Sequence, residues 1–131
     1  MSCNVFTYGS LMFQAVWEQV VHRHYHSGKA VLEDHARYAI AGASYPGMVS
    51  QPGATVEGVL YLDVDTVDIA RLDAFEGNEY RRATVQVRFE DGTCMEAHTY
   101  LYKATQRLQD TSWKVNEFDI QHFLRAYCPE R

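Results

Sequence analysis

The chain has 131 residues, of which 47% are hydrophobic and 22% are charged, and its formal net charge is -5. These values are typical of globular proteins, and the length predicts one domain spanning residues 1–131. The composition argues against a nucleic-acid partner, which needs a basic patch, and no apolar run is long enough to cross a bilayer. The cysteines, Cys3, Cys94 and Cys128, lie far apart. With no secretory signal at the N-terminus, they predict a reducing, cytoplasmic setting.

The first predicted unit is a strand, a glycine turn and a helix. Residues 3–8 form a short apolar stretch, and Ser10 is placed to cap a helix that runs from about residue 11 to residue 21. Apolar side chains recur in this helix at helical spacing, namely Met12, Phe13, Val16, Trp17, Val20 and Val21. Ser27 and Gly28 then mark its end.

The middle of the chain predicts short strands and a second helix. Residues 29–32 and 37–41 are expected to be strands, and residues 42–53, rich in Gly, Ser and Pro, a surface loop. Residues 55–62 alternate as a strand does, and Gly58 within them indicates a bulge or a close backbone approach. The next helix is capped by Asp65 or Thr66 and ends near Glu76, with Gly77 as its stop.

The clearest alternation of apolar and polar residues, over 82–90, is followed by a turn at Asp91-Gly92 and a return strand over 93–102. A two-residue turn would set Val87 opposite Glu96 and Val85 opposite His98. Either the loop holds an extra residue that shifts the register, or the interior is partly polar, as a ligand cavity requires. Both alternatives stay open.

The last part of the chain predicts a polar loop over residues 103–114 and a helix capped by Asn116. The apolar stripe of this helix consists of Ile120, Phe123, Leu124 and Tyr127. Adjacent antiparallel strands combined with helices predict an α+β domain built around a curved sheet or small barrel.

One candidate binding element is the turn Tyr8-Gly9-Ser10-Leu11. Glycine allows a ligand to approach the backbone closely. The N–H groups at a helix start are unpaired and suit a carboxylate or a developing oxyanion. The alternative is a plain strand–turn–helix junction.

The second candidate element contains the carboxylates Asp73 and Glu76, three residues apart and therefore on one side of a helix. Acids near a helix C-terminus oppose the macrodipole, so they are either simply solvated or functional. A glutamate in a tyrosine-lined pocket has a raised pKa and exchanges protons near neutral pH. Glu76 is the better candidate, whereas Asp73 is expected to brace the loop through Arg81 or Arg82.

A metal site is the weakest of the candidate chemistries. His22, His24 and His26 would share a face only in a strand, and no second group of ligands accompanies them. No serine or cysteine lies in a nucleophile-elbow pattern, and Cys3 and Cys94 are expected in the core. The sequence therefore predicts neither a metal nor another cofactor.

Taken together, two segments resemble signatures of the gamma-glutamylcyclotransferase-like superfamily. They are Tyr8-Gly9-Ser10-Leu11 and the run from Leu72 to Gly77 that is followed by Tyr80 and Arg81. Tyr45-Pro46, Gly58 and Tyr100 also fall where that family has similar residues. The resemblance covers roughly residues 4–102.

The resemblance implies a small mixed β-barrel with flanking helices and a cavity at one mouth. It implies a catalytic role for Glu76, and substrate binding by Tyr8, Gly9, Ser10, Leu11, Tyr45, Tyr80 and Tyr100. Such enzymes release 5-oxoproline from small gamma-glutamyl compounds. Leu11 stands where glutathione-pathway members often have asparagine, so the chain looks closer to the branch that acts on gamma-glutamylamines and contains plant avirulence-induced (AIG2-like) proteins.

Two alternatives to this activity stay open. The chain could be a non-catalytic small-ligand-binding module with the same cavity, or it could remove a gamma-glutamyl group from a larger acylated substrate. The sequence gives neither the leaving amine nor the oligomeric state.

Overall fold

The computed structural model describes residues 2–21 and 23–127. Within them, five strands close a mixed barrel in the order β3-β1-β5-β4-β2, because β2 also pairs with β3, and β6 extends the sheet beside β2. The pairing of β1 with β5 is parallel and the others are antiparallel. The strands are β1 (Ser2–Thr7), β2 (Ser27–Ile40), β3 (Pro46–Asp65), β4 (Tyr80–Phe89), β5 (Cys94–Tyr102) and β6 (Leu108–Ser112).

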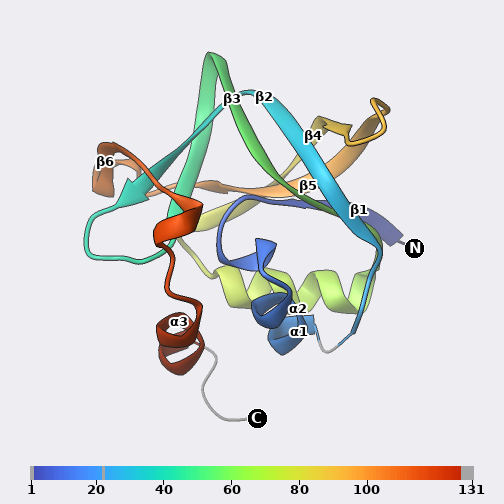
Figure 1. Ribbon diagram of the computed structural model, residues 1–131, viewed down its shortest axis with the longest axis horizontal. Helices are drawn as coiled ribbons and strands as arrows, with labels where there is room; N and C mark the ends of the chain where they lie inside the picture. The colour runs from blue at the N-terminus through green and yellow to red at the C-terminus, as the bar shows by residue number, and fades with distance from the viewer. Residues whose placement is uncertain (1, 22, 128–131) are drawn as a thin grey trace.

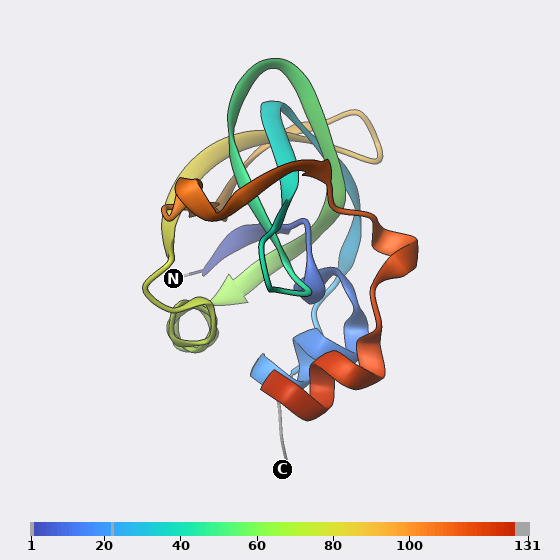
Figure 2. The same cartoon turned by 90° about the vertical axis from the view of Figure 1, so that its left-hand side faces the viewer.

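Three α-helices lie together on one side of this barrel, as the two views in Figures 1 and 2 show. They are α1 (Gln14–Val21), α2 (Thr66–Glu76) and α3 (Ile120–Tyr127). Single 3₁₀ turns occur at η1 (Ser10–Met12), η2 (Thr105–Arg107) and η3 (Val115–Glu117). The predicted α+β fold, a small mixed β-barrel with flanking helices, is confirmed.

Alternation along the strands divides the core in two. Phe6 and Leu60 face the barrel interior with Leu32, Met48, Val56, Val87 and Ala97. Their neighbours Val5 and Tyr61 face the helices and pack with Val16, Trp17, Val64, Leu72 and Phe123. Because successive side chains of a strand point to opposite faces, β1 and β3 contribute side chains to both halves of the core.

The second helix follows the prediction closely. It is capped by Asp65, whose carboxylate accepts a hydrogen bond from the Val67 N–H at 3.3 Å, and it ends at Glu76 beside Gly77. The first helix differs. The Ser10 hydroxyl makes no capping bond, η1 begins at Ser10, and α1 starts only at Gln14. It ends at Val21, so Ser27 and Gly28 open β2 instead of closing the helix.

The two short strands predicted at 29–32 and 37–41 are one long strand, β2. The apolar pattern is interrupted near Asp34, where the register with β3 shifts and Asp34 adopts a positive φ of 62°. This bulge made one strand resemble two. The predicted surface loop over 42–53 is wrong from Pro46 onward. Residues 46–50 pair with β2 beyond this bulge, although Pro and Gly are rare in strands.

The C-terminal predictions need two corrections. Residues 108–112 form β6 instead of a loop, and because the strand is short and mostly exposed it leaves no alternation to read. Asn116 lies in η3 and does not cap α3. The helix begins at Ile120, and the Asp119 carboxylate accepts a hydrogen bond from the His122 N–H at 3.0 Å. Asn and Asp are both favoured at helix N-caps, so residue type alone did not distinguish Asn116 from Asp119.

The hairpin between β4 and β5 follows the first alternative, a longer loop. Phe89 and Thr93 close the turn, and Val87 pairs with Met95 while Val85 pairs with Ala97. This register turns the exposed Glu96 away from the apolar face. His98 lies beside a separate hollow lined also by Cys3, Asp73 and Arg82. Cys94 is exposed at the loop end of β5, so its predicted place in the core is wrong.

Gly58 confirms the predicted close backbone approach. A Cβ atom at this position would lie 2.1 Å from the Thr7 carbonyl oxygen and 2.8 Å from the Phe6 ring. Since backbone on β1 cannot yield cheaply, we expect Gly58→Ala to lower the free energy of unfolding by about 2 kcal/mol. Urea denaturation followed by circular dichroism measures this change in the free energy of unfolding. Thr84→Ala, at an exposed strand position, is the control and should change stability by less than about 0.5 kcal/mol.

Candidate functional site

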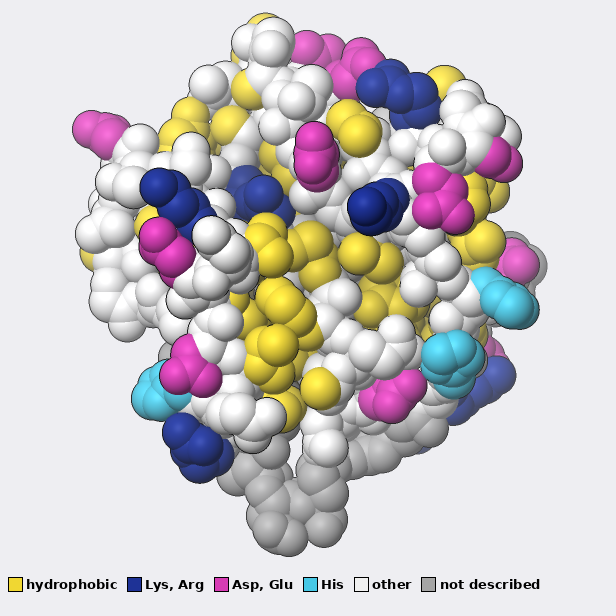
Figure 3. All heavy atoms as spheres, viewed as in Figure 1, with side chains coloured by type: hydrophobic (Ala, Val, Ile, Leu, Met, Phe, Trp, Pro, Cys, Tyr) yellow, Lys and Arg dark blue, Asp and Glu magenta, His cyan; other side chains and the backbone are white. Residues whose placement is uncertain are grey.

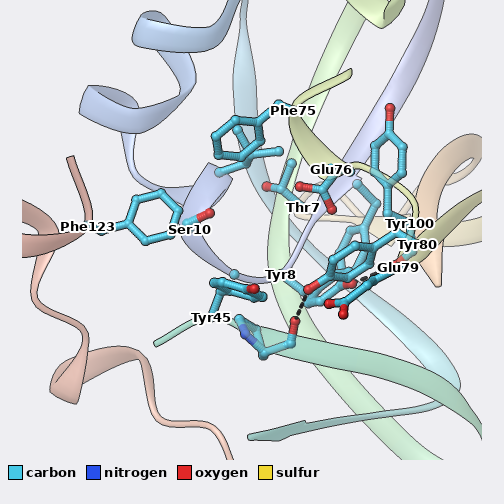
Figure 4. A pocket seen from close by; sticks show the side chains of 14 residues that line it. Thr7, Tyr8, Ser10, Tyr45, Phe75, Glu76, Glu79, Tyr80, Tyr100 and Phe123 are labelled. Atoms are coloured by element: carbon cyan, nitrogen blue, oxygen red, sulfur yellow. Dashed lines mark hydrogen bonds between the residues drawn. The ribbon is translucent and has the colours of Figure 1, made fainter. Parts of the chain in front are cut away.

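A cavity of about 170 Å³ lies where the end of β1, the start of β3, the α2–β4 junction, β5 and α3 meet. This volume accommodates a small molecule and not merely one water. The eight residues proposed from sequence all line it: Tyr8, Gly9, Ser10, Leu11, Tyr45, Glu76, Tyr80 and Tyr100. Figure 4 shows the Glu76 carboxylate pointing into this space beside Thr7.

The turn after β1 forms the enclosed wall of the cavity, since Ser10 and Leu11 are buried. Gly9 is required here because a Cβ atom would lie 2.7 Å from the Pro46 ring. Two side chains hold the carbonyls of the turn: Arg37 donates to the Tyr8 oxygen at 2.6 Å, and the Tyr61 hydroxyl donates to the Leu11 oxygen at 3.0 Å. Within the described chain, no acceptor takes the N–H groups of Gly9, Ser10 or Leu11. The turn therefore offers unpaired donors to a ligand.

Tyrosines supply much of the remaining wall, and their hydroxyls are tied to fixed acceptors. Tyr8 donates to the Tyr100 carbonyl oxygen at 2.6 Å, and Tyr80 donates to the Pro46 carbonyl oxygen at 2.8 Å. Burial raises the pKa of Tyr8, Tyr80 and Tyr100 above the ordinary value. These phenols consequently stay neutral and keep the cavity rigid and hydrogen-bonding.

Glu76 is half-buried at the C-terminal end of α2. No hydrogen bond or ion pair from another described residue reaches its carboxylate. Burial, reinforced by repulsion from Asp73, raises the pKa of Glu76 to about 8. A carboxyl group with this pKa exchanges a proton near neutral pH, which ordinary glutamates do not.

Asp73 lies one helical turn before Glu76 and is held from two sides. Arg82 donates to one of its carboxylate oxygens at 2.9 Å, and the Tyr100 hydroxyl donates to the other at 2.7 Å. The prediction that Asp73 braces the following loop is confirmed for Arg82. These two donors fix the Asp73 carboxylate one turn before Glu76.

Sequence reasoning missed several residues of the site. Glu79 and the rings of Phe75 and Phe123 also line the cavity. Phe123 packs edge-on against both Tyr45 and Phe75, which its place on an apolar stripe did not reveal. Glu79 is bonded to Arg107, from a segment predicted as loop. Only its place between Gly77 and Tyr80 could have pointed to it.

Other candidates from the sequence lie apart from the cavity. His24 contacts Gln14 and Glu18, and His22 lies outside the described residues, as does Cys128. Across residues 2–21 and 23–127, no three His, Cys, Asp or Glu side chains are placed to hold a metal ion. In that same part of the chain, no helix is long and apolar enough to span a membrane. On the face in Figure 3, basic side chains lie apart from one another among acidic ones.

Comparison with known families gives a match over residues 5–117 to the family described as gamma-glutamyl cyclotransferase, AIG2-like. Among curated proteins, Protein AIG2 C of Arabidopsis thaliana is 32% identical over 124 residues, covering 92% of this chain and 74% of the relative. AIG2-like protein A of the same plant is 34% identical over 100 residues, covering 76% of this chain and 61% of that protein. The chain is thus shorter than these plant relatives and spans less than two thirds of the second.

Solved structures agree with this match. The Arabidopsis thaliana protein At3g28950.1 superimposes with a TM-score of 0.76 at 31% identity, covering 93% of this chain and 75% of that one. A structure titled gamma-glutamyl cyclotransferase superimposes with a TM-score of 0.70, covering 83% of this chain and 69% of that one. At 19% identity, this second likeness concerns the fold alone.

The raised pKa of Glu76 leads to a direct prediction. Carboxyl NMR titration of the folded protein should show Glu76 titrating near pH 8. In Asp73→Asn the repulsion is gone but burial remains, so the midpoint should fall only part of the way to its ordinary value. Glu96→Gln, which alters an exposed acid away from the cavity, is the control. A Glu76 midpoint near 4.5 in the wild type would contradict this account of the cavity.

The same pKa predicts how stability depends on pH. Between the ordinary pKa of 4.5 and the folded value of about 8, folded Glu76 keeps a proton that the unfolded chain has lost. The wild type therefore loses unfolding free energy as pH rises through this window, and the loss is complete above about pH 8. Glu76→Gln lacks this loss, so its stability relative to the wild type should increase with pH in urea denaturation series.

Proposed function

This chain belongs to the gamma-glutamyl cyclotransferase, AIG2-like family, and we propose that it is an enzyme that releases 5-oxoproline from a gamma-glutamylamine or gamma-glutamyl amino acid. Glu76 is the general acid and base. The turn from Tyr8 to Leu11 binds the substrate, and Tyr45, Tyr80 and Tyr100 shape the cavity around it. The reaction needs neither metal nor organic cofactor.

The observation that carries the proposal is the placement of two unlike groups in one small cavity. One is a half-buried carboxyl group with a pKa of about 8, and the other is a turn with unpaired N–H groups. A titrating acid alone could be structural, and so could a free helix start. Together they match a reaction that moves one proton and stabilises one anion.

The proposed mechanism is an intramolecular acyl transfer. The α-amine of the glutamyl group attacks its own γ-carbonyl carbon, forming the C–N bond of a five-membered ring. Glu76 accepts the proton that this nitrogen loses and then returns it to the leaving amine as the original amide bond breaks. With a pKa of about 8, part of the Glu76 population is ionised near neutral pH and can accept this proton, and the protonated form can return it.

Substrate positioning also lowers the activation barrier. Because the attack occurs within one molecule, holding the glutamyl chain in a folded conformation can contribute several kcal/mol. The N–H groups of Gly9, Ser10 and Leu11 would bind the α-carboxylate or the oxyanion of the intermediate. The neutral tyrosines keep bulk water from competing for these donors.

We expect Glu76→Gln to abolish turnover, with kcat reduced by at least about 100-fold, because the amide cannot exchange the proton. Purified protein would be incubated with a panel of gamma-glutamyl amino acids and gamma-glutamylamines, and 5-oxoproline measured by mass spectrometry. The folded structure should survive, since amide and carboxylic acid have the same shape.

Glu96→Gln serves as the matched control, because it makes the same chemical change at an exposed strand residue away from the cavity. It should turn over like the wild type. If Glu76→Gln kept full activity, Glu76 would not be the acid and base. If the wild type bound small acidic ligands, seen as a raised melting temperature, but formed no 5-oxoproline from any substrate, the non-catalytic binding module would replace the enzyme.

A further inference from the structure

Arg37 on β2 is a half-buried cation bound only to neutral groups. Its guanidinium donates to the Tyr8 carbonyl oxygen at 2.6 Å and to the Glu57 carbonyl oxygen at 3.2 Å. It also lies over the Trp113 ring, 5.4 Å from the ring centroid. In the described part of the chain, no carboxylate lies within ion-pair distance of it.

Five other arginines differ in this respect, whereas Arg81 and Arg125 are exposed to solvent. Ion pairs with carboxylates are made by Arg23, Arg71, Arg82, Arg88 and Arg107. A guanidinium stays charged at any physiological pH, and withdrawing a charge from water without a counter-ion costs free energy. The exposed Glu57 carboxylate acts on Arg37 electrostatically but forms no ion pair with it. Among the described residues, Arg37 is therefore a half-buried positive charge without an ion pair.

The position of this charge connects it to the cavity. Arg37 does not line the cavity itself, whereas Tyr8 and Gly9 do. The peptide between Tyr8 and Gly9 is trans, as are all peptide bonds of the described chain, so its C=O and N–H point in opposite directions. With the carbonyl directed to Arg37, the Gly9 N–H is directed to the other side, toward the cavity. The guanidinium also polarises this peptide and makes its N–H a stronger donor.

We propose that Arg37 is the positioning residue of the anion site: it orients the Tyr8–Gly9 peptide and supplies, through it, the positive charge that balances a bound carboxylate. The ligand class is a small carboxylate, either the α-carboxylate of a gamma-glutamyl compound or that of 5-oxoproline. The identity of this ligand rests on the proposed function, but the charge preference can be tested without turnover.

The test compares two ligands of nearly the same shape, the charged 5-oxoproline and its neutral primary amide, by isothermal titration calorimetry. The wild type should bind the carboxylate at least about tenfold more tightly than the amide, a difference of about 1.4 kcal/mol. In Arg37→Met this ratio should fall below about threefold, and Arg37→Lys should restore part of it. Arg88→Met is the matched control, because Arg88 pairs with Glu33 away from the cavity, and it should keep the wild-type ratio.

A purely structural role predicts a different result, since a displaced turn would weaken both ligands equally and leave their ratio unchanged. That outcome, or a wild type without preference for the carboxylate, overturns the proposal. If Arg37→Met does not fold, Arg37→Gln replaces it, because glutamine keeps a hydrogen-bond donor but has no charge. The ratio of carboxylate to amide affinity should then also fall below about threefold. A charge preference that depends on Arg37 in a protein forming no 5-oxoproline would refute the proposed reaction and leave the anion site standing.

Discussion

The position of β1 in the barrel is the constraint on which the site depends. This strand pairs with β3 on one side and β5 on the other, so its end cannot shift without disturbing both. Gly58 of β3 allows the two backbones to come within a distance that no side chain would permit. The turn that follows Thr7 is therefore delivered to the cavity at a fixed place, and its donors are oriented before any ligand arrives. Such preorganisation is what makes backbone N–H groups effective toward an anion.

The electrostatics of the cavity follow from how its charges are paired. Asp73 accepts hydrogen bonds from two donors, whereas Glu76, one turn later, accepts none from another described residue, and burial raises its pKa to about 8. Two carboxyl groups on one helix face thus have different environments, because one is held by donors and the other is buried without them. Arg37 stands on the other side of the turn, with carbonyl oxygens as its only hydrogen-bond partners among the described residues. The cavity is consequently flanked by a carboxyl group with a raised pKa and, behind the turn, by a guanidinium charge.

Local patterns in the sequence predicted the parts of the fold that local physics decides. Asp65 and Gly77 bound α2 because capping depends on neighbouring residues. The bounds of the long strands β2 and β3 were predicted wrongly. The bulge at Asp34 and the Pro and Gly residues after Ala43 resemble loop signals, but pairing between β2 and β3 overrides them. The cavity residues near Tyr8 and Glu76 could be found from short motifs. Arg37 and Phe123 could not, since their roles arise only when segments distant in sequence meet.

Part of the cavity wall lies beyond the region that the family match covers. The match ends at residue 117, yet the cavity wall includes Phe123 of α3, which is almost completely buried. Phe123 contacts Phe118, and Phe118 stacks on Phe13 next to η1, so aromatic rings connect α3 to the turn after β1. The groups assigned to proton transfer and anion binding lie inside the matched region. The shape of the cavity is set partly outside this region, because the Phe123 ring closes part of its wall.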